Sequence, residues 1–196
     1  MASPTSALFV VDIQKDLALD PETKIPDAAR IRDAGTSILA VARGITSGSG
    51  AESPLIVFVQ HEESAKDGPL VRGTEPWELV FEPQTGNERE LVVPKNTRDT
   101  FKSNPSLAEK LTAQGIKNIV AFGIQSECCV LETCKGALAA GFRVTLLQGA
   151  HSTYDAKDKT ALQIEKEVED ELKGLGASIV PWETAVSDWK QTGKLE

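Results

Sequence analysis

A cysteine, an aspartate and a lysine in this sequence, Cys129, Asp12 and Lys95, could together support nucleophilic catalysis. Each of them lies shortly after an apolar run. Cys129 follows the run 119–122 and a bend, where a helix is predicted to begin. A helix N-terminus favours a thiolate and presents backbone N–H donors. Asp12 follows its apolar run directly and could act as a general base. Lys95 would favour both anions if it lay beside them.

Each of these residues also has a plainer interpretation when it is taken alone. A cysteine in an apolar, alanine-rich segment is commonly a small core residue, and Cys128 and Cys134 fit that description better than Cys129. A lysine in a loop is usually solvated, and an aspartate after a strand is often a turn or cap residue. The catalytic interpretation therefore depends on whether the fold brings the three side chains together.

Short apolar runs rich in valine and isoleucine indicate the buried strands of a parallel sheet. Six runs are expected to be strands: Ala7–Val11, Leu55–Val59, Leu91–Val93, Ile119–Phe122, Val144–Leu147 and Ser178–Val180. Four segments have helical patterns with recognisable ends: Ala28–Arg43 after Pro26 and Asp27, Asn104–Ala113, about Cys128–Ala140 and about Ala156–Leu172. The alternation predicts an α/β fold, a three-layer α/β/α sandwich around a mostly parallel six-stranded sheet.

Ligands of open parallel sheets bind beyond the carboxyl ends of the strands. The polar residues that stand out just past the predicted strands are Asp12, His61, Lys95, Cys129 and His151. These five are therefore the candidates for a site at that edge of the sheet.

The segment from His61 to Glu90 shows neither helical nor strand periodicity, and it contains three prolines and three glycines. It is predicted to be a long loop with a helical turn around Trp77. Such a loop could cover an active site or pack on a neighbouring subunit, and the sequence favours neither. The segment Gly44–Gly50 is predicted to be a flexible connection.

Length and charge limit the architecture and the class of partner. The 196 residues suffice for one sizeable core, so residues 1–196 are expected to form one domain with its core at about 7–182. The formal charge of -8 argues against nucleic acid and membrane partners, because it repels phosphate backbones and anionic lipids. Three cysteines, two of them adjacent, make no disulfide framework and indicate a reducing compartment, the cytoplasm.

The sequence contains no recognisable cofactor motif. The segment Gly48–Gly50 follows a predicted helix and lacks the third glycine of a dinucleotide fingerprint, and there is no P-loop. Two histidines are too few for most zinc or iron hydrolase sites. We therefore expect neither a cofactor nor a metal.

Four motifs, in order along the chain, resemble those of the isochorismatase-like cysteine hydrolases. They are Val10–Asp16 (VVDIQKD), Val93–Lys95 with Phe101, Gly123–Val130 (GIQSECCV) with Thr133, and Gly141–Ser152. Each motif is weak alone, but their order and their match to strand ends make the combination specific. The resemblance covers residues 7 to about 182 and is strongest to the general cysteine hydrolase branch, which includes streptothricin-hydrolase-like proteins.

The resemblance implies a mechanism for the three residues. It makes Asp12 the base, Lys95 the electrostatic partner and Cys129 the nucleophile, which cleaves an amide-like C–N bond of a small molecule through a thioester. It also implies a cis peptide bond between Ile124 and Gln125, and an oxyanion hole made by the backbone N–H groups of Gln125 and Cys129. Family members commonly assemble, so a homo-oligomer is expected.

The candidates for lining the substrate pocket are Gln14, Leu17, His61, Trp77, Phe101 and His151. Leu17 stands where the family usually has phenylalanine. Gln60-His61-Glu62 stands where metal-binding nicotinamidases carry Asp-x-His, which argues against nicotinamide as the substrate and against a metal. For both histidines a structural role at a strand end is equally open, and Trp77 could instead pack the long loop or fill a subunit interface.

Three other functions remain open. The same fold could hydrolyse the vinyl ether of an isochorismate-like substrate, for which a cysteine is not essential. A binding module could keep the scaffold without activity. Redox sensing through Cys128, Cys129 and Cys134 is less favoured, because a disulfide between adjacent cysteines is strained.

Overall fold

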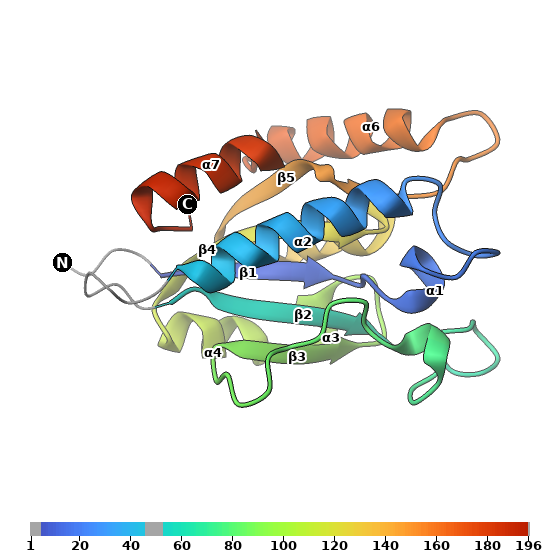
Figure 1. Ribbon diagram of the computed structural model, residues 1–196, viewed down its shortest axis with the longest axis horizontal. Coiled ribbons are helices and arrows are strands. Elements are labelled where there is room, and N and C mark those ends of the chain that lie inside the picture. Colours follow the sequence, from blue (N-terminus) through green and yellow to red (C-terminus); the bar gives the residue numbers. More distant parts are fainter. Residues whose placement is uncertain (1–4, 46–52, 196) are drawn as a thin grey trace.

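The computed structural model describes residues 5–45 and 53–195. Six strands form one sheet in the order β3-β2-β1-β4-β5-β6, and all of the described pairings are parallel (Figure 1). The strands are β1 (Thr5–Val11), β2 (Leu55–His61), β3 (Glu90–Lys95), β4 (Ile116–Ile124), β5 (Arg143–Ser152) and β6 (Ser178–Pro181). The predicted sheet is confirmed, with β5 extending past the predicted run to include His151.

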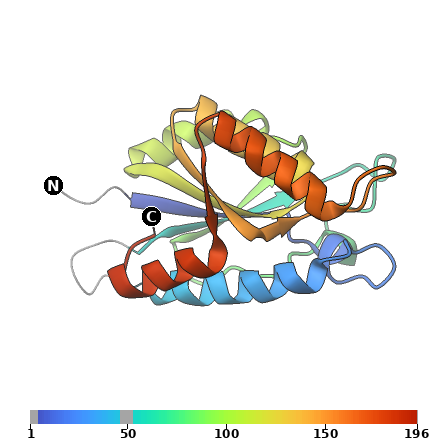
Figure 2. The same cartoon turned by 90° about the horizontal axis from the view of Figure 1, so that it is seen from above.

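Helices cover both faces of this sheet, which confirms the predicted three-layer sandwich (Figure 2). One layer consists of α4 (Leu107–Ala113), α5 (Leu131–Ala139) and α6 (Ala161–Gly174). The other consists of α2 (Ala28–Gly44) and α7 (Trp182–Thr192). Along β1, Phe9 and Val11 pack toward the first layer, whereas Leu8 and Val10 pack toward the second. A strand covered on both faces needs an unbroken apolar run, as β1 has.

The helix predicted from Ala156 begins five residues later, at Ala161. Its start is set by a capping box at Thr160. The Thr160 hydroxyl accepts the backbone N–H of Gln163, and the Gln163 side chain accepts the backbone N–H of Thr160. A reciprocal cap of this kind satisfies two backbone donors, so it outweighs the helical pattern of the preceding residues.

The helix predicted from about Cys128 is different at its start. It opens as a π-helical turn, Ser126–Val130, and becomes α-helical only in α5.

Helices that were not predicted are α7 and the short α1 (Lys15–Ala18) and α3 (Thr100–Ser103). Trp189 of α7 is buried in the core, so the packed region extends past residue 182. None of the helices in the described ranges is long and apolar enough to cross a membrane.

The long segment 61–90 contains a single 3₁₀ turn within its described course, Glu75–Trp77, at the place where a helical turn was predicted. It is joined to the chain that follows β1. The backbone N–H of Lys15 donates to Glu78, and that of Val80 donates to Ile13. The predicted connection Gly44–Gly50 lies mostly outside the described residues.

The end of β4 approaches the end of β1 more closely than a side chain would allow. Gly123 has a φ of 144°, and a Cβ atom on it would lie 2.1 Å from the carbonyl oxygen of Val11. Only glycine fits there, because both the backbone conformation and the space exclude a side chain. Val11 immediately precedes Asp12, so this close approach brings Asp12 next to the segment that carries Cys129.

Replacing Gly123 by Ala should therefore destabilise the protein by about 3 kcal/mol, because the new Cβ collides with backbone that has nowhere to move. The free energy of unfolding in urea measures the effect. The control is Gly44→Ala at the end of α2, where an added Cβ meets nothing within 4 Å. Similar unfolding free energies for the two variants would contradict the close approach.

Candidate active site

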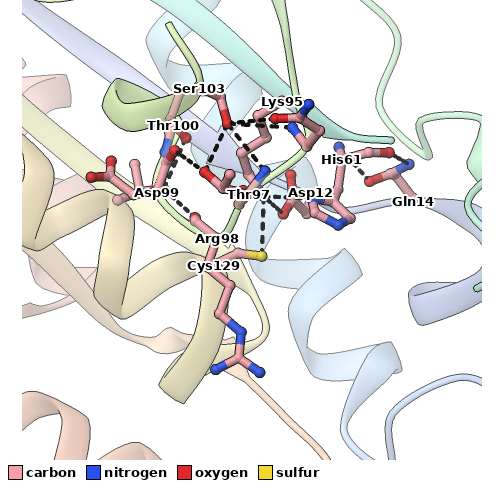
Figure 3. A network of polar contacts seen from close by, with 12 residues as sticks. Asp12, Gln14, His61, Lys95, Thr97, Arg98, Asp99, Thr100, Ser103 and Cys129 are labelled. Carbon is pink, nitrogen blue, oxygen red and sulfur yellow. Dashed lines mark hydrogen bonds and ion pairs between the residues drawn. The ribbon is translucent and has the colours of Figure 1, made fainter. Parts of the chain in front are cut away.

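The side chain of Lys95 is the centre of a polar cluster at the carboxyl edge of the sheet (Figure 3). Its Nζ atom lies 2.7 Å from Asp12 Oδ2 and 3.1 Å from Cys129 Sγ. It also lies 3.0 Å from His61 Nδ1 and 3.2 Å from the carbonyl oxygen of Thr97. The structure thus brings together the three residues for which a catalytic role was predicted, with His61 as a fourth member.

Four adjacent strands position these side chains. Asp12 follows β1 with a φ of 49°, in the left-handed region that non-glycine residues rarely adopt. His61 and Lys95 are the last residues of β2 and β3, and they are paired across the sheet. Cys129 lies in the π-helical turn after β4. Because parallel strands end at one edge, residues more than 100 positions apart meet here.

The ion pair between Lys95 and Asp12 is buried, since the two side chains are 0% and 1% exposed, and is therefore little screened by solvent. Burial alone would lower the pKa of Lys95, but its interactions with the Asp12 carboxylate and with Cys129 outweigh burial and raise the pKa above its ordinary value. Lys95 is therefore a permanent cation between two acidic groups.

The Cys129 thiol is held in its protonated form. Burial raises its pKa well above the ordinary value, and the Asp12 carboxylate adds to the rise while Lys95 opposes it. This differs from the thiolate expected at a helix N-terminus, because burial and a neighbouring anion outweigh any favourable field from the helix. A base is needed to remove the proton, and Asp12 adjoins the thiol.

Further contacts fix the turn that carries Cys129. The Ile124–Gln125 peptide bond is cis, as the resemblance implied. The carbonyl oxygen of Gln125 accepts the backbone N–H groups of Cys128 and Val130. Behind the turn, the hydroxyl of Ser126 lies 2.8 Å from Nδ1 of the fully buried His151. Cys129 therefore lies on a segment that is held both by hydrogen bonds within its own turn and by a contact with β5.

A cavity of about 320 Å³ opens in front of this cluster. It is lined by Asp12, Asp16, Leu17, His61, Glu63, Pro69, Leu70, Arg98, Ile124, Gln125, Cys128, Cys129 and Tyr154. Leu17 and His61, two of the predicted pocket residues, are among them. Segment 61–90 supplies Glu63, Pro69 and Leu70 as well, so part of that loop forms a wall of the cavity.

The other four predicted pocket residues do not line this cavity. Phe101 stacks on Phe9 in the core, with ring centroids 6.0 Å apart. His151 lies behind the turn, and Gln14 is fully buried. Trp77 is connected to the site through its backbone. Its carbonyl oxygen accepts a hydrogen bond from the side-chain amide of Gln14 at 2.8 Å. Phe101 is thus a core residue, whereas Gln14, Trp77 and His151 contact residues of the site or of its turn without lining the cavity.

Several cavity residues carry no distinguishing signal in the sequence. Asp16, Cys128 and Tyr154 belong to stretches that resemble the family, without a predicted role there, whereas Arg98 lies in a segment with no pattern of its own. Their positions depend on how loops fold over the sheet edge. Membership of these stretches is the signal that could have singled out Asp16, Cys128 and Tyr154.

Asp12, His61 and Cys129 present potential metal ligands within 4.8 Å of one another. The Lys95 ammonium, however, contacts all three groups at 2.7 to 3.1 Å. A metal cation at the same point would be repelled by this charge and would compete for the same atoms. The geometry favours an internal cation, Lys95, over a bound metal.

Residues 6–166 match the model of the isochorismatase domain. The chain belongs to the isochorismatase family. It is 37% identical over 154 residues to a streptothricin hydrolase of Streptomyces noursei, a match covering 78% of this chain and 56% of that protein. The chain thus spans about half the length of the curated relatives that it matches first.

Solved structures of other proteins have the same fold. A putative isochorismatase hydrolase from Oleispira antarctica has a TM-score of 0.81 at 20% identity, over 95% of this chain and 98% of that one. A cysteine hydrolase from Pseudomonas syringae has a TM-score of 0.80 at 16% identity, over 96% and 94% of the two chains. The architecture is therefore that of an isochorismatase-family hydrolase.

The charges around the thiol of this isochorismatase-family chain predict its reactivity. Asp12→Asn should speed alkylation of Cys129 by iodoacetamide at a given pH, because it removes an anion that raises the thiol pKa. A shift of one pKa unit corresponds to about a tenfold change in thiolate at a pH below the pKa. Lys95→Met should slow the reaction, because it removes the cation that opposes the rise.

The measurement is best made in a Cys128→Ser background, because Cys128 also faces the cavity. Mass spectrometry of the labelled peptide reports the rate at Cys129. Equal rates in the parent, Asp12→Asn and Lys95→Met proteins would contradict the assigned electrostatics.

Proposed function

We propose that this protein hydrolyses an amide-like C–N bond of a small molecule, with Asp12, Lys95 and Cys129 as the catalytic triad. The observation that carries the proposal is the position of Lys95 Nζ, which contacts both the carboxylate and the thiol at the wall of an open cavity. A base, a nucleophile and a fixed cation between them are the parts that acyl transfer requires.

In the first half of the reaction, Asp12 takes the thiol proton as Cys129 Sγ attacks the carbonyl carbon. The carbonyl oxygen becomes an oxyanion, which the backbone N–H groups of Gln125 and Cys129 stabilise. The C–N bond then breaks, the leaving nitrogen takes the proton from Asp12, and the acyl group remains on sulfur as a thioester. Ammonia or an amine leaves.

In the second half, Asp12 accepts a proton from water, which attacks the thioester carbonyl. The C–S bond breaks, Asp12 returns its proton to the sulfur of Cys129, and the carboxylic acid product leaves. Lys95 stays protonated throughout, so that it compensates whichever neighbour carries the negative charge. This is consistent with its raised pKa.

The matched relatives support a hydrolase activity, since two of them are named streptothricin hydrolases. Their additional length means that their substrate does not transfer directly to this chain. The cavity of about 320 Å³ has both apolar and charged walls and accommodates a small molecule.

Cys129→Ala should abolish release of ammonia or amine from a panel of amides, ureas and lactams, because the attacking atom is lost. With a panel member that is turned over, hydroxylamine should trap the acyl group of the wild-type thioester as a hydroxamate. Cys128→Ala is the matched control and should retain activity, since Cys128 takes no part in the mechanism.

Full turnover by Cys129→Ala would contradict the proposed mechanism. If the same variant hydrolysed isochorismate at the wild-type rate, vinyl-ether hydrolysis would replace C–N hydrolysis as the assigned activity. Urea unfolding of the variant separates loss of chemistry from loss of structure.

A further inference from the structure

His61 connects the buried ion pair to the cavity, and its protonation pattern follows from its neighbour. Lys95 Nζ lies 3.0 Å from His61 Nδ1. An ammonium group has only hydrogens to donate, so Nδ1 must be the acceptor and carries no proton. The ring hydrogen of the neutral histidine is therefore on Nε2.

The ring remains neutral near pH 7. Burial lowers the pKa of His61, and the adjacent Lys95 cation lowers it further. A neutral ring with Nδ1 facing an ammonium retains a single N–H donor, at Nε2.

This donor is not used within the described part of the chain. The nearest acceptor recorded for Nε2 is Glu63 Oε1 at 3.9 Å, which is beyond hydrogen-bond distance. The side chain is 16% exposed, and it lines the cavity together with Cys129. An unused donor thus adjoins the space that a substrate would occupy.

The backbone of His61 is fixed from behind. Its N–H donates to Gln14 Oε1 at 2.9 Å, and its carbonyl oxygen accepts Gln14 Nε2 at 3.0 Å. The pairing with Lys95 across β2 and β3 fixes the same residue from the side. A donor held in this way loses little entropy when it binds an acceptor.

One ring nitrogen of His61 lies within 4.8 Å of Cys129 Sγ. His61 and Cys129 also line the same cavity, so a substrate attacked by that sulfur would lie beside the His61 side chain. The Lys95 cation on the far side of the imidazole also polarises the ring, which strengthens the Nε2–H donor.

We propose that His61 is a further catalytic residue, which donates its Nε2–H to an acceptor atom of the substrate beside the scissile carbon. The inference rests on the proposed function and deepens it. It selects C–N substrates that carry a carbonyl, ether or ring-nitrogen acceptor near the attacked carbon. No proton is transferred, so His61 remains neutral and the reaction balances as described above.

Two near-isosteric substitutions test the roles of the two ring nitrogens of His61 separately. In His61→Asn, the side-chain oxygen can replace Nδ1 as the acceptor for Lys95, but nothing replaces Nε2. In His61→Gln, the longer amide can place an N–H donor near the position of Nε2. The assay uses the panel member with the highest kcat/KM as its substrate. The rate of Cys129 alkylation by iodoacetamide as a function of pH reports on the ion pair independently of turnover.

His61→Asn should lower kcat/KM about tenfold to a hundredfold, as expected for the loss of one fixed donor to the reacting group, while the alkylation profile stays at that of the wild type. His61→Gln should recover a substantial part of the loss. Urea unfolding of both variants shows whether they remain folded.

Full activity in His61→Asn would overturn the proposal. So would a loss of activity accompanied by an equal shift in the alkylation profile, because His61 would then act only through Lys95. A folded His61→Gln protein no more active than His61→Asn would also overturn it. Cys129→Ala is measured in parallel. Turnover by Cys129→Ala would show that the triad mechanism fails, and this result does not depend on what the His61 variants show.

Discussion

The ion pair between Lys95 and Asp12 is the interaction on which the rest of the site depends. Either charge alone would be costly in a position that is almost fully buried, because the protein interior solvates ions poorly. Together they are stable only at hydrogen-bond distance, which requires the ends of β1 and β3 to be held in register. The pairing of Val11 with Val59 between β1 and β2, and of His61 with Lys95 between β2 and β3, maintains that register.

The same ion pair would allow the proposed nucleophile to stay protonated until a substrate is bound. Burial and the Asp12 carboxylate raise the pKa of Cys129 and so favour its protonated form in the free protein. A protonated thiol is less susceptible to oxidation than a thiolate. In the proposed mechanism, the proton moves to Asp12 only as the sulfur attacks, and Lys95 compensates the charge at each stage. Such a site favours reaction with a bound substrate over reaction with passing electrophiles.

A layer of buried polar residues supports the reactive groups without facing the cavity. Gln14 binds both backbone groups of His61, and His151 lies against Ser126 in the turn that carries Cys129. Nε2 of His151 lies 3.5 Å from Glu169 Oε1, which extends this support to α6. Gln14 and His151 were expected to line the pocket. They lie behind the site because polar residues at strand ends can point into the interior when partners are available there.

The sequence by itself determined the layered α/β/α architecture and the three candidate catalytic residues, because apolar runs and strand ends are local features. The exact start of α6 followed from the cap at Thr160, which is also local but stands against a longer helical pattern. Tertiary structure decided the rest. The contact between Lys95 and His61 depends on strand register, and the cavity wall depends on where segment 61–90 folds. Both are long-range consequences of packing, which residue order alone does not express.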